Sequence, residues 1–197
     1  YGHAHSLYLL AGMLEEMGER LRPDGIVATS MMLLQPEREV IERAFARQVT
    51  NRYGCEEVSL IACECERHAG LHLNAEHAAV ELLRDDGSPC APGEDGRIVV
   101  TEFVNLGMPM LRYEVGDHGV LHDRPCPCGR PSPLLRTVTG RTADFLVAAD
   151  GSRVAGISLI ENTLTRFPGI AQLQVVQEVV GRVELNVVRA AGWDEAV

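Results

Sequence analysis

The sequence predicts an α/β protein in which a helix, strand and helix are followed by an antiparallel, barrel-like β section and a small α+β tail. Three patterns predict this fold class. Apolar residues recur at helical spacing up to about Phe45, short apolar runs separated by turn residues fill the region from about 58 to 138, and a last helix pattern precedes two strand patterns. With 197 residues, 46% of them hydrophobic, the chain can bury a sizeable core in one domain or two small ones.

The first third of the chain predicts an α/β layer. Ser6 can cap a helix that Gly18 is placed to end. The predicted buried stripe of this helix consists of Leu7, Leu10, Ala11 and Leu14. The β-branched run at 25–29 predicts a strand, and Pro36 then opens a second helix. The apolar face of that helix consists of Val40, Ile41, Ala44 and Phe45.

The middle and the tail predict mostly strands. Short strands are expected at 58–62, 79–83, 97–103, 110–114 and 134–138, and together they predict the barrel-like section. In the tail, a strand at 145–148, a turn at Asp150-Gly151, a helix at 158–166 and a hairpin pairing 172–179 with 182–188 form a βαββ unit. We therefore expect one domain over 1–140, with the α/β layer at 1–57 and the β section at 58–140, and a second over 141–197.

The charge balance excludes several classes of function. Twenty-eight acidic residues against eighteen basic ones give a net charge of −10, which disfavours nucleic acids and anionic membranes as partners. Every basic residue is Arg, so the chain holds no lysine for a Schiff base, a Walker motif or general-base catalysis. No apolar run reaches about 18 residues and no charged segment precedes an apolar one, so we expect a soluble, cytoplasmic protein, and Tyr1 indicates an excerpt of it.

The six cysteines favour a metal site over disulfides. They stand at positions 55, 63, 65, 90, 126 and 128, too few for a disulfide scaffold, and they form two close pairs whose members would share a face of an extended strand. One imidazole and three thiolates suit tetrahedral zinc with closed, structural coordination, and the candidate set is Cys65, His72, Cys126 and Cys128. Cys63, His68 and His77 compete with these ligands, and burial as small apolar residues is the alternative for the cysteines.

Three motifs carry a resemblance to a known family. They are NRYGCEE at 51–57, RYEVGD at 112–117 and GRTAD at 140–144, and in this order and spacing they resemble the adenylate-forming superfamily of acyl-CoA synthetases, adenylation domains and luciferases. The segments CERHAGLH at 65–72, GRIVVT at 96–101 and CPCGR at 126–130 resemble its phenylacetate-CoA ligase and CapK-like branch. The resemblance runs from about Leu7 to Val188. It implies the end of the large AMP-binding domain and the start of the small C-terminal domain.

The resemblance implies roles for individual residues. Glu57 matches the catalytic glutamate that positions the magnesium of MgATP, and carboxylate oxygens are suitable ligands for this hard cation. Tyr53 matches the aromatic residue that stacks on adenine, and Asp117 matches the carboxylate that binds the ribose hydroxyls. The other implied cofactor-binding residues are Gly54, Arg112 and Arg141. The two arginines are the cations available to the phosphoryl oxygens. Relatives that carry the same Cys, His and Cys-x-Cys set favour structural zinc.

The implied reaction is ATP-dependent activation of a carboxylic acid to an acyl-adenylate, followed by transfer to a thiol such as coenzyme A. The implied cofactors are ATP or AMP, magnesium and structural zinc. The expected partners are the acid, the nucleotide and the thiol acceptor, with no nucleic acid and no membrane, and a homodimer is compatible with the sequence. The residues that hint at the acid pocket are His3, His5, Tyr8, Met31 and Met32.

The sequence also departs from the family's pattern. It contains neither the glycine-rich phosphate loop nor the lysine of the small domain, Met31 and Met32 stand where small residues face adenine, and Ala143 replaces the hinge aspartate. We therefore expect this stretch alone to be inactive. The alternative from another class is a zinc-stabilised, non-catalytic binding or scaffold module that retains the family's fold. The sequence upstream of Tyr1 discriminates, since a phosphate loop there would support the enzyme.

Overall fold

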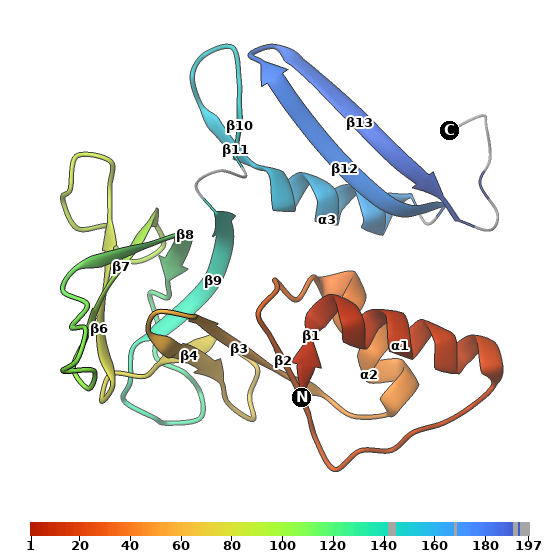
Figure 1. The fold of residues 1–197 in the computed structure, drawn as a ribbon, viewed down its shortest axis with the longest axis horizontal. Helices are drawn as coiled ribbons and strands as arrows, with labels where there is room; N and C mark the ends of the chain where they lie inside the picture. Colours follow the sequence, from red (N-terminus) through yellow and green to blue (C-terminus); the bar gives the residue numbers. More distant parts are fainter. Residues whose placement is uncertain (142–144, 168, 191–192, 194–197) are drawn as a thin grey trace. The chain divides into compact units, whose positions relative to one another are not determined.

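The computed structural model describes residues 1–141, 145–167, 169–190 and 193 (Figure 1). The chain divides into two compact units, Tyr1–Thr139 and Gly140–Val197. That these units are the end of a large domain and the start of a small one stays a prediction. Ala143 lies outside the described residues. None of the described helices has both the length and the apolar character needed to cross a membrane.

The first unit is built on one mixed sheet. Its strands run in the order β1-β2-β3-β4-β5-β9-β8-β7-β6. Their bounds are β1 Gly2–His3, β2 Ile26–Thr29, β3 Val49–Cys55, β4 Ser59–Glu64, β5 Leu71–Leu73, β6 Ala78–Leu83, β7 Asp95–Glu102, β8 Tyr113–Leu121 and β9 Leu134–Arg141. The strand β3 pairs parallel with β2 and antiparallel with β4, so it joins the α/β layer to the antiparallel section. The predicted α/β fold class is confirmed.

The helices α1 (Ala4–Met17) and α2 (Gln35–Phe45) connect the parallel strands and contact each other. Their shared core with β2 and β3 contains Ala11, Leu14, Ile26, Ile41 and Phe45. The predicted cap at Ser6 is wrong. Because β1 pairs with β2 and leads directly into the helix, α1 begins at Ala4 with His3 as its N-cap, and Ser6 lies in the first turn.

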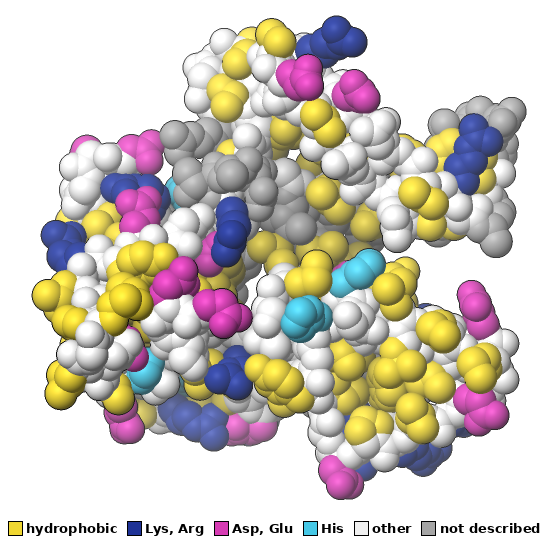
Figure 2. Space-filling model, viewed as in Figure 1, with side chains coloured by type: hydrophobic (Ala, Val, Ile, Leu, Met, Phe, Trp, Pro, Cys, Tyr) yellow, Lys and Arg dark blue, Asp and Glu magenta, His cyan; other side chains and the backbone are white. Residues whose placement is uncertain are grey.

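One face of α1 is apolar and exposed. Leu10, predicted to be buried, is 40% exposed, and Leu9, Met13 and Met17 are exposed beside it, as the hydrophobic side chains over α1 in Figure 2 show. Ala11 and Leu14 are buried as predicted. The helix is therefore apolar on both faces, and periodicity alone does not distinguish the one that packs on the sheet.

The antiparallel section encloses the second core, which includes Val58, Ile61, Leu82, Ile98 and Leu135. The predicted strand at 110–114 is displaced, because β8 starts at Tyr113. The amides of Gly107 and Met108 both donate to Asn105 Oδ1, each at 3.2 Å. This side-chain-capped turn interrupts the apolar run, so strand pairing resumes only at β8.

The antiparallel section is curled but open. In the described residues β4 has β3 and β5 as its neighbours while β6 has only β7, so the strands do not close into a barrel. Nevertheless the hydroxyl oxygen of Tyr53 on β3 lies 2.8 Å from Asp117 Oδ2 on β8, although β8 is four strands away from β3 in the sheet order. In a flat sheet four steps would separate them by roughly 19 Å. The sheet must therefore bend strongly, which is the barrel-like feature of the prediction.

In the part that the structure describes, the second unit contains two antiparallel hairpins and one helix. Its elements are β10 Phe145–Val147, β11 Arg153–Ala155, α3 Gly156–Arg166, β12 Ile170–Val179 and β13 Arg182–Arg189. The first hairpin turns at Asp150-Gly151, where Gly151 adopts a φ of 82°. The predicted βαββ order thus gains one strand, β11, which is three residues long.

Candidate functional site

Two tyrosine hydroxyl groups bind two carboxylates where β3 and β8 approach each other. Tyr53 donates to Asp117 Oδ2 at 2.8 Å, and Tyr113 donates to Glu57 Oε1 at 3.0 Å. Hydrogen bonds to an ionised carboxylate are stronger than neutral ones. We call Tyr53, Glu57, Tyr113 and Asp117 the tyrosine–carboxylate cluster. It joins residues of the first and second sequence motifs. Glu57 and Tyr113 are 56 positions apart in the chain, and Tyr53 and Asp117 are 64 positions apart.

The two carboxylates differ in exposure. Asp117 is buried on β8, whereas Glu57 is exposed in the turn between β3 and β4. The buried Asp117 therefore has a fixed position, and the exposed Glu57 is accessible to a ligand. Tyr113 was not among the predicted site residues, although it lies within the second motif.

Gly54 is required by a close approach of the backbone. A Cβ atom there would lie 2.0 Å from the carbonyl oxygen of Ser59 on β4. The register between β3 and β4 also shifts between Tyr53 and Gly54. This bulge aims the preceding tyrosine. Gly54 thus has a packing reason of its own, and its role in cofactor binding stays a prediction.

The two predicted cationic residues lie at or next to strand ends. Arg112 has a φ of 48° and donates through Nε to Glu81 Oε2 at 3.1 Å, in an exposed ion pair. Arg141 is the exposed last residue of β9 and belongs to the second unit. Contact of either guanidinium group with a phosphate stays a prediction.

The predicted metal ligands lie together. One ligand atom from each of Cys65, His72, Cys126 and Cys128 lies within 4.8 Å of the others. Cys65 Sγ is 3.6 Å from Cys126 Sγ, and Cys128 Sγ is 3.4 Å from His72 Nε2. We call these residues the Cys/His cluster. The loop between β8 and β9 provides Cys126 and Cys128, β5 provides His72, and Cys65 directly follows β4.

The distances fit tetrahedral zinc. With Zn–S of about 2.3 Å and Zn–N of about 2.1 Å, two sulfurs would be about 3.8 Å apart and a sulfur and a nitrogen about 3.6 Å apart. Ser132 Oγ lies 2.9 Å from His72 Nδ1 and so orients the ring with Nε2 towards Cys128. With four protein ligands such a site would be closed and structural.

Backbone amides support the thiolates. The amide of Arg67 donates to Cys65 Sγ at 3.4 Å, and that of Arg130 donates to Cys128 Sγ at 3.5 Å. The hydrogen bond from Arg130 lowers the pKa of the Cys128 thiol. Since zinc binds the deprotonated thiolate, this donor favours the metal-binding form.

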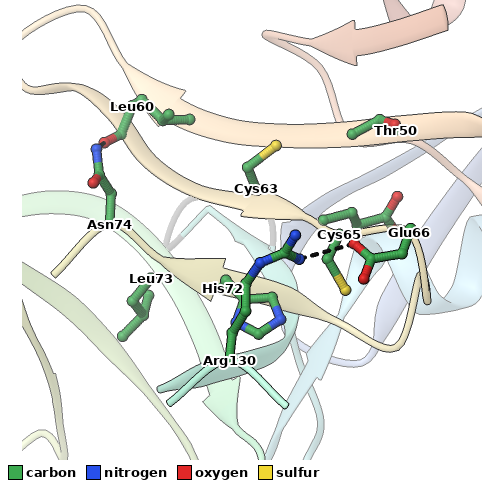
Figure 3. Close-up of a pocket in the computed structure, with 10 residues that line it drawn as sticks. Thr50, Leu60, Cys63, Cys65, Glu66, His72, Leu73, Asn74 and Arg130 are labelled. Carbon is green, nitrogen blue, oxygen red and sulfur yellow. Dashed lines mark hydrogen bonds and ion pairs between the residues drawn. The ribbon is translucent and has the colours of Figure 1, made fainter. Parts of the chain in front are cut away.

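The competing ligands are not members of the Cys/His cluster. His68 Nδ1 contacts Glu64 Oε2 at 2.9 Å, and His77 Nε2 contacts the Val58 carbonyl oxygen at 2.8 Å. Cys63 lines an open pocket of about 530 Å³ together with Cys65 and His72 of the cluster and with the paired Arg130 and Glu66 (Figure 3), but it is not one of the four clustered residues. Burial raises the pKa of the Cys63 thiol, which disfavours its thiolate.

The predicted acid-pocket residues lie around α1 and β2. The ring of His5 lies 5.9 Å from that of Tyr8, and His5 Nδ1 is 3.1 Å from Glu37 Oε1 on α2. Met31 is half exposed after β2, where Ser30 adopts a φ of 63°. Their contact with a substrate stays a prediction.

Comparisons with known proteins identify relatives. The chain is 29% identical over 163 residues to the phenylacetate-coenzyme A ligase of Thermus thermophilus, covering 81% of this chain and 34% of that protein. It is 26% identical over 146 residues to protein CapK of Staphylococcus aureus, covering 74% of this chain and 30% of CapK. The chain thus spans about a third of the length of the curated relatives that it matches. No family model matches it.

The fold has a solved counterpart. A crystal structure of 2-hydroxyisobutyryl-CoA ligase in the postadenylation state, with an acyl-AMP ligand, superposes with a TM-score of 0.80 at 20% identity. The match covers 95% of this chain and 42% of that one. With the curated relatives and the motifs at 51–57 and 112–117, these matches confirm the resemblance. The chain is thus similar in sequence to the phenylacetate-CoA ligase and CapK-like branch of the adenylate-forming superfamily, and it shares the fold of a solved acyl-CoA ligase.

Proposed function

We propose that this chain belongs to an enzyme that uses ATP to activate a carboxylic acid and transfers the acyl group to a thiol such as coenzyme A. The supporting observation is the tyrosine–carboxylate cluster, because it joins the motif residues that the resemblance assigns to the nucleotide. The names of the relatives support the same reaction, since they include a phenylacetate-coenzyme A ligase and a ligase with bound acyl-AMP.

Asp117 and Tyr53 would bind the nucleoside part of ATP. The hydroxyl of Tyr53 fixes one oxygen of Asp117, so the carboxylate is oriented before the ligand arrives. The ribose hydroxyls would donate to this carboxylate in charge-assisted hydrogen bonds. The ring of Tyr53 would lie against adenine. These contacts would hold the nucleotide in one orientation.

Glu57 would act on the phosphate side. In the first half-reaction a carboxylate oxygen of the acid bonds to the α-phosphorus while the bond to pyrophosphate breaks, so charge builds on the leaving oxygens. The exposed carboxylate of Glu57, oriented by Tyr113, offers hard oxygen ligands to a magnesium ion. Bound magnesium would neutralise phosphate charge. In the second half-reaction the thiol sulfur bonds to the acyl carbon, AMP leaves and the thiol proton is released.

The Cys/His cluster would hold a structural zinc ion. Its donor set of one imidazole and three thiols suits zinc, and closed coordination leaves no position for a substrate. The ion would fasten the loop between β8 and β9 to β4 and β5. It would thereby stabilise the curled sheet that brings β3 and β8 together.

The experiment is acid-dependent exchange of labelled pyrophosphate into ATP by the full-length protein. The acids tested should include phenylacetate and 2-hydroxyisobutyrate. Glu57→Gln should reduce the exchange rate by about tenfold or more, because a magnesium-positioning carboxylate acts as charge builds. Glu56→Gln, in the same exposed turn, is the matched control. Failure of the wild-type protein to exchange with any acid and to bind nucleotide would contradict the enzyme and favour the scaffold module.

A further inference from the structure

Glu102 is a buried carboxylate that the proposed reaction does not use. Its side chain, at the end of β7, is 7% exposed, and its Oε1 lies 3.5 Å from His77 Nε2. Its Oε2 is buried without a hydrogen-bond partner among the described residues. A buried carboxylate costs free energy unless it is paired. The position of Glu102 beside a histidine therefore calls for a reason.

The surroundings of His77 fix its tautomer. Nε2 lies 2.8 Å from the carbonyl oxygen of Val58 and 3.5 Å from the Glu102 carboxylate. Both neighbours accept hydrogen bonds, so Nε2 carries the proton and donates it to the Val58 carbonyl. The negative charge of Glu102 beside this N–H group favours the same arrangement.

Val58 is the residue after Glu57, and His77 binds its carbonyl oxygen. Val58 is 1% exposed and anchors the end of the turn in the core. Tyr113 meanwhile binds the Glu57 carboxylate itself. The turn is thus held at two points. Tyr113 on β8 binds the Glu57 carboxylate, and His77 binds the carbonyl oxygen of Val58.

The backbone preorganises His77 and Glu102. Ala78, the residue after His77, pairs with Glu102 in the β6–β7 ladder. The amide of Phe103, the residue after Glu102, donates to the His77 carbonyl oxygen at 3.0 Å. These contacts fix the histidine and the carboxylate relative to each other without any contribution from a ligand.

We propose that His77, supported by Glu102, is a positioning residue for Glu57. The imidazole holds the Val58 carbonyl, and thereby holds the Glu57 carboxylate where the magnesium of MgATP would bind. This inference rests on the proposed function and adds two residues to it. Neither residue is among those proposed to contact the nucleotide, so their effect should appear in the magnesium dependence and not in nucleotide affinity.

The test measures pyrophosphate exchange by the full-length protein at varied magnesium concentration, with the acid that exchanges fastest. His77→Phe retains a ring but removes the donor. It should raise the magnesium concentration for half-maximal exchange by about ten- to a hundredfold, while AMP affinity without magnesium stays unchanged. His77→Gln, whose amide can donate to Val58, should restore part of the loss. His122→Phe, in the loop after β8, is the matched control.

The outcomes separate this inference from the proposed function. An unchanged magnesium dependence in His77→Phe, together with a slow Glu57→Gln variant, would overturn the positioning role alone. A wild-type protein without exchange, or a Glu57→Gln variant as fast as wild type, would overturn both. The double variant should be no slower than Glu57→Gln, whereas independent, additive losses would indicate a merely structural role. If His77→Phe does not fold, Glu102→Gln should show a smaller shift in the same direction, and no shift would contradict the proposal.

Discussion

The Cys/His cluster and the tyrosine–carboxylate cluster bring distant parts of the chain together in different ways. The first consists of short side chains, with Cys65 and Cys126 buried, and its atoms are close enough to share one ion. The second uses long tyrosine side chains that span between strands four positions apart in the sheet, and it leaves Glu57 exposed. A closed set of ligands is suited to stability, and an open set is suited to binding and releasing a substrate.

The largest expected effect concerns the Cys/His cluster. Cys128→Ser removes one of three thiolate ligands, so it should lower zinc content below one ion per chain and destabilise the protein by several kcal/mol, because metal binding contributes to folding. Elemental analysis and thermal unfolding measure the two effects. Cys90→Ser, outside the cluster, is the control. An unchanged Tm with no bound metal in the wild type would refute the structural zinc site.

The next effect concerns the strand that carries Tyr53. Gly54→Ala would place a Cβ atom 2.0 Å from the Ser59 carbonyl oxygen, so β3 and β4 must separate. We expect a loss of about 1–3 kcal/mol in the free energy of unfolding and weaker nucleotide binding. Gly12→Ala in α1 is the matched control, because among the described residues no atom outside the helix's own neighbouring backbone lies within 4 Å of the added Cβ. Alanine there should stabilise the helix by about 1 kcal/mol. Equal stability of both variants would contradict the close approach.

A smaller effect is expected within the tyrosine–carboxylate cluster. Tyr53→Phe retains the ring for stacking but removes the hydrogen bond to Asp117. A hydrogen bond to a charged group contributes about 1.5–3 kcal/mol, of which a partly buried pair should show the lower end. AMP affinity, measured by calorimetry on the full-length protein, should fall by about tenfold. Tyr1→Phe, whose side chain is exposed, provides a control of the same chemistry, and equal affinities in both variants would argue against an oriented carboxylate.

The smallest effect is expected at the rim of the Cys/His cluster. Arg130 and Glu66 form an ion pair at 2.9 Å, but both side chains are more than half exposed. Solvent and salt screen such pairs, so Glu66→Gln should leave Tm and zinc content unchanged. A marked loss of zinc in this variant would show that the pair supports the cluster, contrary to our account.

The sequence predicted the members of the Cys/His cluster better than it predicted the polar contacts. Residue type and the resemblance suggested Cys65, His72, Cys126 and Cys128, and the fold brings one ligand atom of each within 4.8 Å of the others, while their binding of a metal stays a prediction. The sequence left Cys63 as a competitor. In the fold Cys63 is the partner of His72 in the β4–β5 pairing, but it is Cys65 that contacts Cys126 of the loop between β8 and β9, and the sequence does not show which cysteine this loop approaches. The contact of Tyr113 with Glu57 depends on the curl of the whole sheet, and local patterns do not encode it.

The helices show the same limit. The pattern of α2 predicted its buried Ile41 and Phe45, because that helix has one apolar face. In α1 the pattern placed Leu10 inside, because both faces are apolar and the sheet contacts only one. Ser6 likewise has the chemistry of a cap, but the pairing of β1 with β2 starts the helix three residues earlier, with His3 as the cap. Tertiary contacts decide these positions.

The measurement that tests the account most directly is the nucleotide affinity of Asp117→Ala in the full-length protein. This change removes the carboxylate that Tyr53 orients, and with it both acceptors proposed for the ribose hydroxyls. We expect the Kd for AMP to rise by about tenfold or more, at about 1.4 kcal/mol per decade, while exposed Asp24→Ala binds like wild type. An Asp117→Ala variant with the affinity of wild type would contradict the assignment of the tyrosine–carboxylate cluster to the nucleotide.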